Sequence, residues 1–183
     1  KFIYFMKIKS YFLNIFISSL LFFYFGCSEN QTDEKVIQKA LLEEGFITSE
    51  NLGKALSVIE ARKGQIEKSE VVVEGFIGGR KEPFTEKSAV FILGDNSLET
   101  CDKKADDNCP TPWDVCCEDK KKVTASTISI QVLDSNGTLL TGTLDGLSGL
   151  KPGVKVKVKG NIDDKSEGNV LIINAVKIEL LSD

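Results

Sequence analysis

The sequence contains no histidine among its 183 residues, and it has one methionine and one tryptophan. Histidine is the commonest general base near neutral pH and a frequent zinc ligand, so its absence removes the usual candidate for both roles. The sequence also has no glycine-rich phosphate loop and no Gly-x-Ser-x-Gly elbow, and we expect no basic run that could bind a polyanion. These absences exclude the common hydrolase and nucleotide-binding motifs, and we expect a protein that is not an enzyme and holds no cofactor.

The N-terminal region has an apolar stretch from Tyr11 to Phe25, which follows a short basic start and ends at Gly26-Cys27. The stretch is shorter than the roughly 20 residues of a membrane-spanning helix, and it fits the hydrophobic part of a secretory signal. It resembles the lipobox of bacterial lipoproteins, which favours leucine where this chain has Tyr24. The sequence therefore predicts a lipoprotein signal peptide over 1–26.

The resemblance implies cleavage before Cys27, with lipid on its thiol, and places the protein at the cell envelope, anchored to a bacterial membrane. An uncleaved anchor helix is the alternative. Met6 is the only methionine and the expected start, which would make residues 1–5 an upstream extension.

Removal of the signal changes the composition of the remaining chain. The 23 basic residues fall to 20 while all 27 acidic residues remain, which gives a net charge of −7. The remaining aromatic residues are Phe46, Phe76, Phe84, Phe91 and Trp113. The core must therefore consist mainly of valine, isoleucine and leucine, which are concentrated in the second half of the chain, as is typical of β-rich folds.

Hydrophobic periodicity predicts a tether with a short helix over 27–48 and a domain over 49–183. Helical spacing favours helices over 34–45 and 49–64, the second capped by Ser49 or Asn51. Period-two alternation predicts five strands, and the segment after the third is expected to form a short helix or turn over 143–150. The predicted strands cover residues 70–77, 88–93, 124–134, 154–160 and 170–180.

This order of strands predicts a mainly β fold, a five-stranded OB-fold-like barrel preceded by one or two short helices and the signal segment. Gly75 inside the first strand indicates a bulge or a sharp coil. Val154, Val156 and Val158 are expected to face the barrel interior. A small β-sandwich is the alternative architecture.

A long irregular stretch over 95–122 holds four cysteines, which are Cys101, Cys109, Cys116 and Cys117. Its centre reads Cys109-Pro-Thr-Pro-Trp-Asp-Val-Cys-Cys117. This string, inserted between the second and third barrel strands, resembles that of a family of uncharacterised bacterial exported OB-fold proteins. The resemblance covers about residues 54–180 and implies the fold and the loop, but no activity.

Clustered cysteines outside the cytoplasm favour disulfides. A bond between adjacent residues is strained, which leaves two pairings: Cys101–Cys116 with Cys109–Cys117, or Cys101–Cys117 with Cys109–Cys116. Closing a loop of this length stabilises a protein by about 3 kcal/mol in the chain-entropy model. A site in which four thiolates bind a metal is the alternative, although the spacing lacks paired Cys-x2-Cys knuckles. Redox-active thiols are a third interpretation.

The function favoured by these features is a binding or interaction module, with glycans or envelope proteins as partners. The predicted ligand face comprises Trp113 in the cysteine-containing loop and Lys155, Lys157 and Lys159 on the fourth strand. Single-stranded nucleic acid is the alternative ligand, but it requires stacking aromatics and a positive groove that this acidic chain lacks. Binding of a metal by the four cysteines is the other alternative function.

Overall fold

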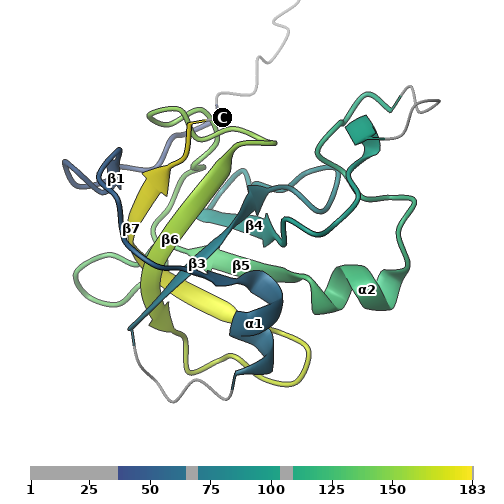
Figure 1. Cartoon of the computed structure of the whole chain (residues 1–183). Coiled ribbons are helices and arrows are strands. Elements are labelled where there is room, and N and C mark those ends of the chain that lie inside the picture. The colour runs from purple at the N-terminus through teal and green to yellow at the C-terminus, as the bar shows by residue number, and fades with distance from the viewer. Residues whose placement is uncertain (1–36, 65–69, 104–108, 183) are drawn as a thin grey trace, which may run out of the picture. The chain divides into compact units, whose positions relative to one another are not determined.

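The computed structural model of the protein describes residues 37–64, 70–103 and 109–182. The predicted signal peptide, Cys27 and most of the tether lie outside the described residues. In chain order the elements are β1 (Ile47–Thr48), β2 (Leu56–Ser57), α1 (Val58–Lys63), β3 (Glu70–Ile77), β4 (Val90–Gly94), the 3-10 turn η1 (Cys101–Lys103), α2 (Lys120–Ala125), β5 (Thr127–Gln131), β6 (Lys155–Ile162) and β7 (Ile172–Leu180) (Figure 1).

Five strands close into a ring in the order β3, β4, β5, β7, β6 and back to β3. The pairing is antiparallel at every contact of the ring except β5 with β7, which is parallel. A five-stranded closed sheet with Greek-key connections is the OB-type barrel, and closure leaves no long exposed edge. The predicted mainly β, OB-fold-like barrel is confirmed, and the sandwich alternative is not what forms.

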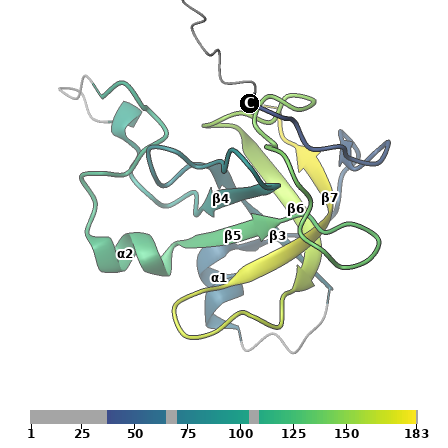
Figure 2. The same cartoon turned by 180° about the vertical axis from the view of Figure 1, so that it is seen from behind.

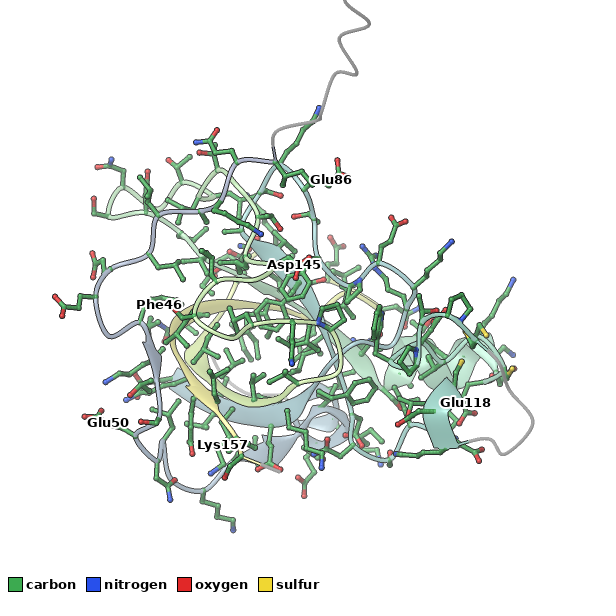
Figure 3. The ribbon with its side chains drawn as sticks, turned by 90° about the horizontal axis from the view of Figure 1, so that it is seen from above. Phe46, Glu50, Glu86, Glu118, Asp145 and Lys157 are labelled. Carbon is green, nitrogen blue, oxygen red and sulfur yellow. The ribbon has the colours of Figure 1, made fainter. Side chains whose placement is uncertain are left out.

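The barrel interior is filled mainly by aliphatic side chains, together with Phe91 (Figure 3). Val156 and Val158 on β6 are fully buried, as predicted, and Val154 packs partly buried against the same core. Full burial of such a side chain stabilises the fold by about 1.5–3 kcal/mol. The alternation of valines in the sequence therefore fixes which face of β6 points inward.

Two glycines allow strands to approach more closely than a side chain permits. A Cβ on Gly75 would overlap the carbonyl oxygen of Gly94, at the point where β3 also pairs with β4. A Cβ on Gly160 would overlap the carbonyl oxygen of Asn174. The register shift of the sheet lies between Lys159 and Gly160, where the partner on β7 moves from Lys177 to Ala175, so the bulge is on β7. Of the bulge or sharp coil predicted at Gly75, the bulge does not form, because β3 pairs with β6 without a shift through this residue.

The helix predicted over 34–45 does not form in the described part, residues 37–45. Lys39 forms an isolated β-bridge with Thr143, and Ala40 N–H donates to the carbonyl of Thr143 at 2.9 Å. Ala40 is buried at 3 % exposure, whereas Leu41 is 86 % exposed, so the apolar residues do not share one buried face. Pairing with a distant segment overrides the local helical spacing.

The helix predicted over 49–64 is reduced to α1, which begins after Ser57 and not at Ser49 or Asn51. Ser57 and Glu60 form a capping box, with Glu60 N–H donating to Ser57 Oγ at 3.1 Å. The residues just before it are used by β2, because Leu56 pairs in parallel with Val73 of β3. A sheet contact that is remote in sequence therefore delays the start of the helix.

The remaining predicted strands form with shifted bounds, and residues 143–150 form turns. The start of the strand predicted over 124–134 was wrong, because Lys120–Ala125 is α2 and β5 begins at Thr127. Asp119 caps α2 by accepting from the N–H groups of Lys121 and Lys122. Across the ranges described here, the structure has no helix with the length and apolar character needed to cross a bilayer.

Candidate functional site

The cysteine loop, residues 95–122, leaves the barrel directly after β4. The buried Asp95 carboxylate accepts from Ile59 N–H and Ser97 N–H, each at 2.9 Å, and Asp95 N–H donates to the Ser126 carbonyl at 2.8 Å. Burial alone would raise the pKa of Asp95, but these donated hydrogen bonds outweigh it and hold the pKa below its ordinary value. Asp95 therefore joins α1 to the two ends of the loop region.

A small apolar cluster outside the barrel interior supports the cysteine loop. It consists of Phe76 from β3, Leu98 and Val115 from the loop, and the partly buried Val123 from α2. The loop and α2 lie beside the barrel on the side of β4 and β5, away from β7 (Figures 1 and 2). We call these four side chains the loop cluster, and they make the loop a packed structure.

Backbone hydrogen bonds join the loop to itself and to the connection between β3 and β4. Cys101 N–H donates to the Asp114 carbonyl at 2.9 Å. The Trp113 carbonyl accepts from Gly79 N–H at 3.0 Å, and the Trp113 indole N–H donates to the Lys81 carbonyl at 3.0 Å. These bonds fix the position of Trp113 on both its backbone and its side chain.

The structure brings the four predicted cysteines together, on the same side of the barrel as Glu118 (Figure 3). The sulfur atoms of Cys101, Cys109 and Cys116 all lie within 4.8 Å of one another, and Cys101 Sγ is 3.6 Å from Cys116 Sγ. Cys117 Sγ is 3.9 Å from Cys116 Sγ. Among these four cysteines the structure has no disulfide, so neither predicted pairing is confirmed.

The environment of Cys101 and of Cys116 opposes ionisation of both thiols. Burial, with further contributions from contacts with Cys116 and Cys109, raises the pKa of Cys101 to about 12. The hydrogen bond from Cys101 lowers the pKa of Cys116, but Cys117, desolvation and Asp114 outweigh it, and that pKa is raised overall. Neither thiol has the lowered pKa typical of a catalytic or redox-active cysteine.

A groove of about 790 Å³, which we call the loop groove, runs between the cysteine loop and the barrel. Its lining combines one indole ring, basic and acidic side chains, and the turn that precedes β6. The lining residues are Glu74, Phe76, Asn96, Thr100, Asp102, Lys103, Pro112, Trp113, Lys151, Pro152, Gly153 and Lys155.

The loop groove contains two of the four residues of the predicted ligand face, Trp113 and Lys155. The other two lysines are held elsewhere on the sheet. Lys157 Nζ is 3.6 Å from Glu179 Oε2, and Lys159 Nζ is 2.9 Å from Glu70 Oε1. The alternating lysines of β6 therefore do not form a continuous basic stripe.

Sequence reasoning missed the contribution of Lys103 and Lys151 to the loop groove. The Lys-Pro-Gly turn before β6 contains Lys151, but in the sequence this turn indicates only the start of a strand. No local signal indicates that this turn lies near Trp113, because the turn is held by a bond that is remote in sequence, from Gly153 N–H to the carbonyl of Ile77 at the end of β3.

A second groove, of about 830 Å³, lies between α1 and α2 and is strongly basic. Its cationic side chains are Arg62, Lys63, Lys120, Lys121 and Lys122. The expectation of no basic run was wrong, because Lys120–Lys122 is one. Part of this charge has a structural role: Arg62 donates to the Thr127 and Asn169 carbonyls at 2.9 and 2.8 Å, and Lys122 pairs with Glu118 at 2.7 Å.

No protein-family model matches the sequence, and no curated protein shows significant similarity to it. Among solved structures, that of the hypothetical protein ygiW from E. coli is similar to this chain, with 16 % identity and a TM-score of 0.36. The similarity covers 70 % of this chain and 91 % of the other. The assignment of the barrel given above comes from the strand order itself.

Proposed function

We propose that the protein is a non-enzymatic binding module, held at the cell envelope by lipid on Cys27, and that the loop groove binds an envelope glycan. The observation that carries the proposal is the placement of Trp113 beside Lys155 and Lys151 in one groove. An indole face packs against the apolar face of a sugar ring, and the neighbouring charged and amide groups hydrogen-bond its hydroxyls.

The composition of the loop groove favours a glycan over a nucleic acid. Acidic side chains, Glu74 and Asp102, face the same groove as the lysines. A phosphate backbone requires a positive channel and several stacking aromatics, whereas this groove has one indole and mixed charge. Oligosaccharides are established ligands of OB-type barrels, and an envelope location gives access to them.

The test uses the emission of Trp113, which is the only tryptophan of the chain. The full-length protein in detergent is titrated with chitohexaose and with soluble peptidoglycan fragments. We expect a saturable change in emission, and we expect Lys155→Ala to weaken binding at least tenfold. Lys159→Ala is the matched control, because it alters the same strand outside the groove.

No saturable change with any of these glycans, or equal weakening by the two substitutions, would overturn the glycan site. If the purified protein retains an envelope protein and binds no glycan, the ligand of the loop groove is a protein and the glycan proposal is wrong. The lipid anchor is tested separately by the intact mass of the membrane fraction, where Cys27→Ser should abolish the added acyl mass.

A further inference from the structure

We propose that Cys101, Cys109 and Cys116 form a thiolate site for a soft d¹⁰ cation, either zinc or copper(I). The three sulfur atoms come from separate parts of the cysteine loop and all lie within 4.8 Å of one another. A cation about 2.3 Å from each sulfur places the sulfurs about 3.8–4 Å apart. The observed arrangement therefore needs only small side-chain adjustments to surround an ion.

Three sulfurs around one point are what distinguish this site from a disulfide. A disulfide joins two sulfurs and makes no use of a third, whereas a soft cation gathers three or four. The shortest separation, 3.6 Å between Cys101 Sγ and Cys116 Sγ, is close to the spacing expected across a tetrahedral or trigonal metal site. The donor set is all sulfur, which selects soft ions over calcium or magnesium.

The backbone holds the three ligands in place before any ion binds. Cys101 is fully buried in η1, and its N–H is bonded to the Asp114 carbonyl two residues before Cys116. Asp102 N–H bonds to the Pro112 carbonyl at 3.3 Å, which fastens the other half of the loop. Cys109 Sγ lies 3.3 Å from Thr111 Oγ1. The loop cluster packs beside these residues, because Leu98 and Val115 lie close in sequence to Cys101 and Cys116.

Cys117 distinguishes the two ions. Its sulfur is 3.9 Å from Cys116 Sγ and outside the group of three. Zinc takes four ligands, so it would recruit Cys117 or a water molecule, whereas copper(I) is satisfied by three thiolates. Substitution of Cys117 should therefore weaken a zinc site in which Cys117 is the fourth ligand, and should leave a copper(I) site, or a zinc site completed by water, unchanged.

The test uses the full-length protein, isolated from the envelope without reductant for intact mass, and then reduced and stripped with a chelator. Zinc(II) or copper(I) alone is added back, and stoichiometry is read by native mass spectrometry and affinity by competition with a chromophoric chelator. We expect one ion for each chain, and Cys116→Ser, an exposed position, should abolish stoichiometric binding. Cys101→Ser and Cys109→Ser should do the same, with circular dichroism as the check on folding.

Several results would overturn the site. One is that the reduced protein takes up neither zinc(II) nor copper(I) in a stoichiometric amount. Another is that Cys116→Ser keeps its fold and binds the ion with wild-type affinity. An isolated protein whose mass and peptide map show Cys101, Cys109 or Cys116 in disulfides would also overturn it. Because Lys155→Ala leaves every sulfur in place, metal uptake and glycan binding can fail independently.

Discussion

The barrel and the cysteine loop are held together in different ways. The barrel is closed on itself, and its interior is filled by buried side chains from all five of its strands. The described part of the loop rests on the loop cluster, a few backbone hydrogen bonds and the buried carboxylates of Asp95 and Asp114. The stability of the barrel is therefore distributed over many contacts, whereas that of the loop depends on a few. The loop can consequently open while the barrel remains folded.

The largest expected effect is in the barrel. Phe91 is fully buried, and its ring centroid lies 5.8 Å from that of Phe84. Phe91→Ala should lower the free energy of unfolding by about 3–5 kcal/mol, because it removes a large side chain and leaves a cavity. Urea denaturation followed by circular dichroism measures this loss, and a change below about 1 kcal/mol would contradict the assignment of Phe91 to the core.

Val115 gives the matching change in the loop cluster. Val115→Ala removes two buried methyl groups and should cost about 1.5 kcal/mol. Hydrogen exchange should accelerate at the Cys101 amide, which bonds beside Val115, and should stay slow at the amides of β5. Equal acceleration in both regions would show that the loop and the barrel unfold as one unit.

Asp95 connects the two regions and makes their junction sensitive to pH. Because the folded-state pKa of Asp95 is lowered, its contribution is fully present above the unfolded-state pKa of about 3.9. The contribution is lost as the pH falls through the lower, folded-state value. Asp95→Asn should cost about 1.5 kcal/mol at neutral pH. Urea unfolding at a series of pH values from 7 down to 3 measures the free energy of unfolding of the wild type and of the variant. The difference between the two free energies should shrink on acidification. A difference that stays constant would contradict the assigned role of Asp95.

The smallest effect is expected on the outer face of the barrel. The pair between Lys159 and Glu70, at 2.9 Å, is largely solvent-exposed. Lys159→Ala should therefore change the free energy of unfolding by less than about 1 kcal/mol. Thermal unfolding at low and at high salt measures this contribution, and a loss as large as that of Val115→Ala would place more of the barrel's stability on its surface than its packing indicates.

Sequence periodicity was sufficient for the barrel, because strands such as β5 and β6 alternate strictly between buried and partly exposed residues. It failed for the segments before β3, where Ala40 and Leu56 are placed by bonds to residues far along the chain. It also missed α2, which has no apolar face and only Val123 packed against the loop cluster. The Asp119 cap was the available signal.

For the candidate site, the sequence was enough to group the four cysteines but not to predict their distances. Trp113 and Lys155 share a groove only because β6 pairs with β3. Lys157 and Lys159 are diverted by partners at Glu179 and Glu70, on different strands. Such long-range partners leave no trace in the local pattern of a single sequence.

The position of β7 has a consequence for the closure of the barrel. This last strand pairs with β1, β5 and β6, so it completes the ring and also fastens the segment around Ile47. A chain that lacks residues 172–180 cannot close the barrel, because β5 and β6 then have no strand between them. Until β7 is in place, the other four strands of the ring can form only an open sheet, whose edges at β5 and β6 remain unpaired.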